Sequence, residues 1–154
     1  MLRHRGMSIV VLVAALFAVN VIARLIIRFG FDGDDTAQSG ASIAMFGAIG
    51  LILAAVAFVR SQRVAPAEWL PEIGGGALGG MLLTVLVGPF ISGANPFTES
   101  GDYFFSQIAL YVGFAVLGTL IGFWTAIMLG RDFRSRTLKA YQTARARQRR
   151  VVRR

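Results

Sequence analysis

The chain has 154 residues, of which 55% are hydrophobic and 16% are charged, and its formal net charge at pH 7 is +8. A chain of this length forms one domain. It contains no cysteine and a single histidine, His4, which excludes a disulfide framework, a thiolate metal site and a multi-histidine metal or haem site built by this chain alone. We therefore expect neither a bound metal nor a cofactor.

The positive charge gathers at one end of the chain. Residues 131–154 hold ten Arg or Lys and one acid, Asp132, whereas residues 1–130 hold six Arg and seven acids. The high isoelectric point is therefore a property of this tail. Fifteen of the 16 basic residues are Arg, and together with abundant Ala, Gly and Val this composition suggests a GC-rich bacterial genome.

Four apolar segments precede the tail, and each meets or approaches the roughly 20 apolar residues that a membrane-spanning helix needs. We expect spans over residues 7–29, 41–59, 73–91 and 103–129. The third segment is rich in glycine, but in lipid the alternative to a helix is an unpaired backbone, so a helix is favoured. Pro89 is expected to kink or end this helix near one face of the membrane.

The connecting segments predict the orientation. Residues 30–40 and 92–102 are polar and acidic without a base, whereas residues 60–72 hold Arg60 and Arg63. With the N-terminus inside, fourteen Lys or Arg face the cytoplasm and only two lie near the outer side, which follows the positive-inside rule.

The predicted fold is therefore all-α, an integral membrane four-helix bundle with both termini in the cytoplasm. Residues 1–130 form the transmembrane domain, and residues 131–154 form a basic cytoplasmic helix or tail. The first segment is expected to be a retained anchor, because its apolar run continues past the possible signal-cleavage site at Ala23. The expected location is the bacterial cytoplasmic (inner) membrane.

Small residues recur at a spacing of four in the third and fourth segments, which places each pair on one face of a helix. The pairs are Gly75/Gly79, Gly76/Gly80 and Gly118/Gly122. One interpretation is tight packing within this bundle. The other is docking of a partner subunit, for which the third segment is the better candidate because its glycines occupy more than one face.

Asn20, Arg24 and Arg28 form a polar stripe on the first helix, again at a spacing of four. Both arginines lie close enough to the outer boundary to reach the headgroups and to pair with loop acids, namely Asp32, Asp34, Asp35, Glu99 or Asp102. The alternative is an outer-leaflet pocket for an anionic headgroup, in which Gln107 of the fourth helix would take part.

The tail is expected to form a helix with Phe133, Thr137, Leu138 and Tyr141 on one side. Its basic residues are candidates for contact with anionic lipid or with an acidic partner, and they include Arg131, Arg134, Arg136, Lys139, Arg145, Arg147, Arg149 and Arg150. We do not expect it to bind nucleic acid, because Tyr141 is the one aromatic residue in its second half and a base-stacking platform is therefore not supported.

The sequence shows no motif for a reaction, and every acid lies in a loop or at a boundary. We therefore expect a non-enzymatic accessory or scaffolding subunit of a bacterial inner-membrane complex, with a membrane-protein partner or a second copy of itself. The alternative is a small oligomeric transporter, lipid flippase or pore that uses the stripe of Asn20, Arg24 and Arg28. A phage-type holin and an enzyme acting on a lipid-linked phosphate rank behind these two.

Overall fold

The computed structural model describes residues 2–30, 35–92 and 101–151. These ranges are helical apart from short turns at residues 62–65 and 129–132. Among the described residues, four helices are long and apolar enough to cross a membrane, so the protein is an all-α, multi-pass membrane protein.

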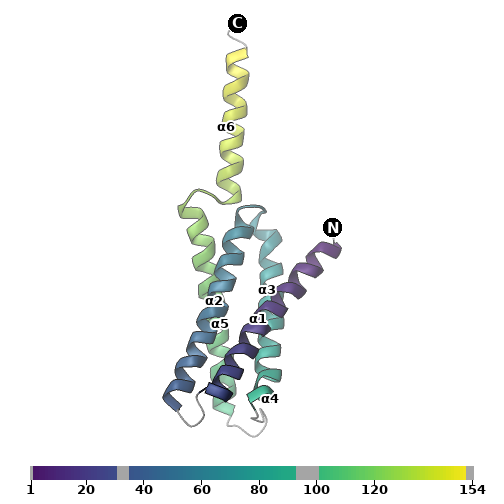
Figure 1. Cartoon of the computed structure of the whole chain (residues 1–154). Helices are drawn as coiled ribbons and strands as arrows, with labels where there is room; N and C mark the ends of the chain where they lie inside the picture. Colours follow the sequence, from purple (N-terminus) through teal and green to yellow (C-terminus); the bar gives the residue numbers. More distant parts are fainter. Residues whose placement is uncertain (1, 31–34, 93–100, 152–154) are drawn as a thin grey trace.

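The bundle is built from two helical hairpins in sequence (Figure 1). The first hairpin consists of α1 (Leu2–Gly30) and α2 (Asp35–Ser61). The second begins with α3 (Pro66–Leu82), which continues through a π-helical turn η1 (Leu83–Val87) into the short α4 (Gly88–Ser92). It returns as α5 (Gly101–Met128), and α6 (Phe133–Val151) follows.

The third span differs from its predicted bounds at both ends. It begins at Pro66 because proline suits the first helical position, where its missing N–H has no intrahelical partner to lose. At the other end the helix continues past Pro89 to Ser92, one residue beyond the predicted bound, and the turn before the proline is π-helical. The Gly88 N–H donates to the Leu83 carbonyl five residues back, and this wider turn precedes the proline, whose ring excludes a carbonyl four residues back.

The helices pack as two parallel pairs. α1 and α3 run in one direction, and α2 and α5 run in the other (Figure 1). The core lies between them and includes the fully buried side chains of Leu16, Ile49, Leu53, Trp69 and Tyr111. The Trp69 ring lies against that of Phe123, with centroids 5.6 Å apart, and joins α3 to α5.

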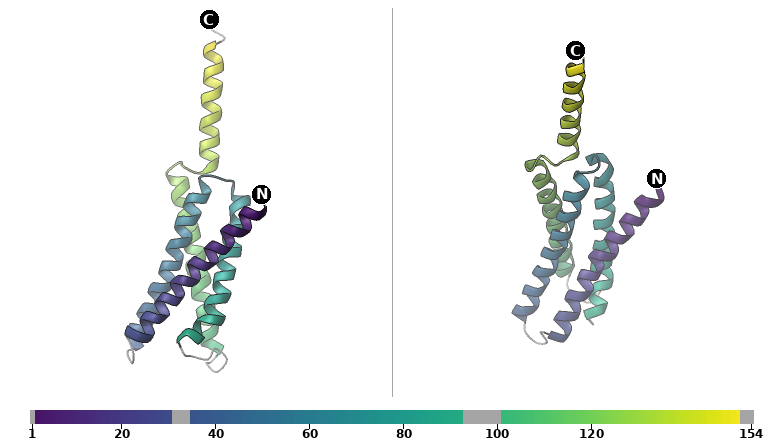
Figure 2. Two further views of the ribbon diagram at one scale, coloured as in Figure 1. Left: turned by 45° about the vertical axis from the view of Figure 1, so that its right-hand side comes forward. Right: turned by 45° about the horizontal axis from the view of Figure 1, so that its top comes forward.

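Both ends of the chain lie at the same end of the bundle (Figure 1). Figure 2 shows that α1 crosses its neighbours diagonally, so its N-terminal half leans away from the other helices. α6 projects beyond the bundle, roughly along its length, in all three views.

The break between α5 and α6 has clear local causes. Gly130 has a φ of 59°, a left-handed conformation that glycine adopts without strain. The Gly130 N–H donates to the Ile127 carbonyl and the Arg131 N–H to the Ala126 carbonyl, which together form a Schellman motif. Asp132 then caps the start of α6 by accepting the Ser135 N–H at 3.3 Å.

Candidate functional site

The glycines of α5 bring its backbone against that of α2. A Cβ added at Gly118 would overlap the Gly50 carbonyl oxygen, and one added at Gly122 would overlap the Ala54 carbonyl oxygen. No side chain can be accommodated at either position without moving a helix. These two glycines therefore serve close packing inside the bundle.

The glycines of α3 leave room for side chains of α1 and α5 and not for a neighbouring backbone. An added Cβ would lie 2.5 Å from the Leu12 side chain at Gly76, 2.8 Å from Val13 at Gly79 and 2.7 Å from the Tyr111 hydroxyl at Gly80. Gly75 has more room, because its nearest neighbour, Ile9, would be 3.8 Å away. The described contacts of these glycines are thus made within this chain.

Arg24 points into the bundle. It is 8% exposed, and its Nε donates to Oδ1 of the fully buried Asn20 at 2.8 Å. Gly88 provides the space for the guanidinium, since a Cβ there would lie 2.6 Å from the Arg24 Nε. The π-helical turn η1 immediately precedes this glycine.

Further buried polar atoms lie between α1, α3, η1 and α5 in the turns that precede this level of the bundle. Gly76 meets Leu12, Gly80 meets Leu16 and Gly88 meets Arg24, always 64 residues apart. At the same offset Asn20 lies level with Thr84. Thr84 is about one turn beyond Gly80, where an added Cβ would meet the Tyr111 hydroxyl. Asn20 Nδ2, Thr84 Oγ1 and the Tyr111 hydroxyl are buried without a hydrogen-bond partner among the described residues. We call Asn20, Arg24, Thr84 and Tyr111 the polar column.

The other two candidates for a headgroup pocket, Arg28 and Gln107, lie outside the polar column. Arg28 is exposed and donates to the Ile91 carbonyl at 3.0 Å, so it contacts the end of α4. Gln107 is half-buried on α5, one turn before Tyr111. The acids proposed as partners lie outside the described residues or side chains, namely Asp32, Asp34, Asp35, Glu99 and Asp102.

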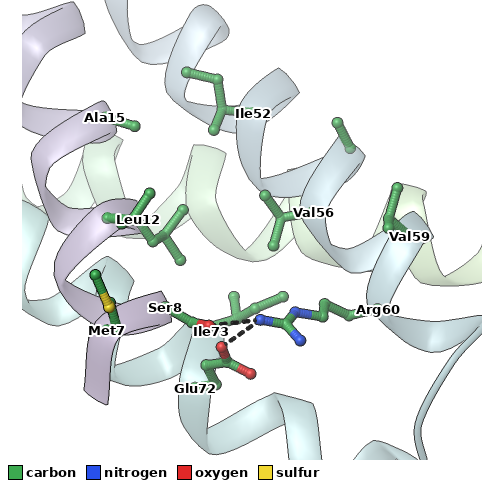
Figure 3. Close-up of a pocket in the computed structure, with 12 residues that line it drawn as sticks. Met7, Ser8, Leu12, Ala15, Ile52, Val56, Val59, Arg60, Glu72 and Ile73 are labelled. Atoms are coloured by element: carbon green, nitrogen blue, oxygen red, sulfur yellow. Dashed lines mark hydrogen bonds and ion pairs between the residues drawn. The ribbon is translucent and has the colours of Figure 1, made fainter. Parts of the chain in front are cut away.

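A second polar group lies at the end of the bundle that carries both termini. Arg60 of α2 donates from Nη2 to Glu72 Oε1 of α3 at 2.6 Å and to Ser8 Oγ of α1 at 2.9 Å. This ion pair lies at one end of an apolar cavity of about 610 Å³ between α1, α2 and α3 (Figure 3). We call this cavity the lateral groove.

The lateral groove was not predicted from the sequence. Arg60 and Glu72 both fall in the segment expected to be an interfacial turn. In the structure that turn is only a few residues long, so the two side chains face each other across it. The signal in the sequence was a pair of opposite charges at the two ends of the predicted connection. The sequence does not show that α1 leans away from the other helices, which the groove requires.

The basic tail residues are largely free of the bundle. Every described side chain from Arg136 to Ala146 is exposed. Two contacts hold the base of α6, from Arg136 Nη1 to the Gln62 carbonyl and from Lys139 Nζ to the Gly130 carbonyl, both at 3.4 Å. The side chains of Arg147, Arg149 and Arg150 lie outside the described part of the chain.

The chain was compared with protein-family models, curated proteins and solved structures, and none of them matches it.

Proposed function

We propose that the protein is a non-enzymatic accessory or scaffolding subunit of a bacterial inner-membrane complex, and that α6 docks an acidic cytosolic partner. The observation that carries the proposal is the placement of α6. This helix of 19 residues projects from the bundle and exposes its described basic side chains, from Arg134 to Arg145, together with Phe133, Leu138 and Tyr141.

The direction of α6 bears on its ligand. A basic helix that binds anionic lipid lies in the plane of the membrane surface with its apolar face inserted. α6 instead runs roughly parallel to the long axis of the bundle and projects beyond its end (Figure 2). This direction favours a protein partner over lipid for the outer half of the helix. Exposed bases of this kind steer an acidic surface into contact.

The test is recovery of partners from membranes in mild detergent. The unmodified protein should bring down a partner in fixed stoichiometry, and combined replacement of Arg134, Arg136, Lys139 and Arg145 by Gln should release it. As a control, replacing the three arginines by Lys keeps the charge and should retain the partner. Equal recovery with the Gln variant, or a protein recovered alone, contradicts the proposal.

The polar column favours a second function, that of a small oligomeric transporter, lipid flippase or pore. An arginine inside a span is costly and marks a pathway or a binding site by default. Arg24 is buried beside Asn20, and three more polar atoms are buried without partners among the described residues. Such groups can line a path for water or for an anionic group.

This second function is tested in reconstituted vesicles. Arg24→Ala should abolish the flux of a fluorescent anion or the flipping of labelled phosphatidylglycerol, while leaving assembly intact. Arg63→Ala removes an exposed arginine from the other end of the bundle and should leave flux unchanged. Flux that persists in Arg24→Ala would eliminate the transport role.

A further inference from the structure

We propose that the lateral groove binds one phospholipid whose headgroup carries both a phosphate and a primary ammonium group, as phosphatidylethanolamine does. The inference is independent of the proposed function, because the groove lies between α1, α2 and α3 and includes no residue of α6.

The walls of the groove match a hydrocarbon chain. Each of the three helices contributes apolar side chains to these walls, chiefly Leu12, Ala15, Ile52, Val56 and Ile73. The volume of about 610 Å³ lies within the range of about 300–1,000 Å³ that is usual for small-molecule sites. Figure 3 shows the apolar side chains on the walls and the charged pair at one end. The groove is therefore apolar along its walls and charged at one end, as a phospholipid is.

The length of the groove fits one leaflet. Arg60 lies one residue before the end of α2, at the boundary of the bundle, and the groove extends back along this helix to Ile52. Eight residues of helix cover about 12 Å. Half of a hydrocarbon core is about 15 Å thick. An acyl chain with its headgroup at Arg60 would thus reach close to the bilayer centre.

The charged pair selects the headgroup. Arg60 uses Nη2 for both of its bonds to described residues, and its planar fork of donors suits a phosphate. Glu72 is bonded through Oε1, and its other oxygen can accept an N–H from an ammonium group. A choline has no N–H to donate, and a purely anionic headgroup would meet the Glu72 carboxylate. The pair is therefore complementary to phosphatidylethanolamine.

The experiment is native mass spectrometry of the full chain released from nanodiscs that contain equal amounts of phosphatidylethanolamine and phosphatidylglycerol. The unmodified protein should retain one lipid and enrich phosphatidylethanolamine roughly tenfold, the ratio that about 1.4 kcal/mol produces. Glu72→Gln removes the negative charge that pairs with the ammonium group, although it keeps one oxygen acceptor, and should shift the retained lipid toward phosphatidylglycerol.

Two further variants block the groove itself. Ala15→Trp and Ala55→Trp place a large side chain in it from opposite walls, and each should lose the retained lipid. Ala14→Trp is the control, because Ala14 is exposed on the same helix as Ala15 but does not line the groove. Two blocked variants that keep as much lipid as the control contradict the proposal. Retention of the two lipids in the ratio at which the nanodisc contains them would also contradict it. So would a polypeptide bound in the groove in place of a lipid.

Discussion

Glycine has different consequences at different positions of α5. At Gly118 the missing side chain lets the α2 backbone approach, whereas a Cβ at Gly113 would meet no atom within 4 Å. The spacing of four in the sequence identifies the face that carries Gly118 and Gly122, but it does not say whether a partner or the same chain covers it. The parallel register with Gly50 and Ala54 identifies the chain's own α2 as the cover for these two positions.

Gly118→Ala should therefore lower the free energy of unfolding by about 1–3 kcal/mol, the usual cost of overpacking a tight interface. Gly113→Ala is the matched control on the same helix and should change it by less than about 1 kcal/mol, in the stabilising direction, because alanine is the better helix former. Titration with SDS in mixed micelles, followed by circular dichroism, measures both. Equal destabilisation by the two substitutions would show that α2 does not pack against α5 at Gly118.

The arginines of α1 show what a residue pattern leaves open. The spacing of four predicts that Asn20, Arg24 and Arg28 share one face of the first helix. The sequence could not show that Arg24 turns inward while Arg28 stays exposed. That difference depends on Gly88, which lies 64 residues away and leaves room for one guanidinium.

At the scale of elements, apolar run length was a good guide to the four spans, and its clearest error was the start of the third. α3 begins at Pro66, within a segment whose polar residues and prolines indicate a turn. Its first turns are held by the buried Trp69, a tertiary contact that no local pattern reveals. The π-helical turn before Pro89 is likewise a compromise between a proline and continued packing of the helix.

The start of α6 depends on a titrating cap. Hydrogen bonds from Ser135, first from its side chain, hold the pKa of Asp132 below its ordinary value of 3.8. A carboxylate whose pKa is lower in the folded helix stabilises that helix fully above its ordinary pKa. The stabilisation is lost as the pH falls through the lowered value.

We therefore expect the first turn of α6 to fray as the pH falls below about 3.8. Secondary Cα chemical shifts of Ser135 to Thr137 in micelles report this turn. Asp132→Asn keeps a capping side chain but removes the titration, so its shifts should stay constant over the same range. A wild-type turn that is as constant as the Asn variant would show that the carboxylate charge does not stabilise the helix.

At the scale of the whole molecule, the two parallel pairs share nearly the same register. α1 meets α3 at an offset of 64 residues, and α2 meets α5 at an offset of 68. Near-equal offsets are expected when two helical hairpins have the same arrangement and are related by an axis that runs along the bundle. The arrangement returns the chain to the side where it began. Both the lateral groove and α6 therefore belong to that side.

The orientation of that side determines whether α6 can meet a cytosolic partner. The chain has no cysteine, so single cysteines at Ser39 and Thr143 can be labelled in intact cells with a membrane-impermeant thiol reagent. Ser39 lies in the first turns of α2, and α2 begins at the end of the bundle opposite to α6 (Figure 1). We expect the cysteine at position 39 to react from outside and the cysteine at position 143 to react only after the cells are opened. Reaction of position 143 from outside, or of both positions from the same side, would contradict the account.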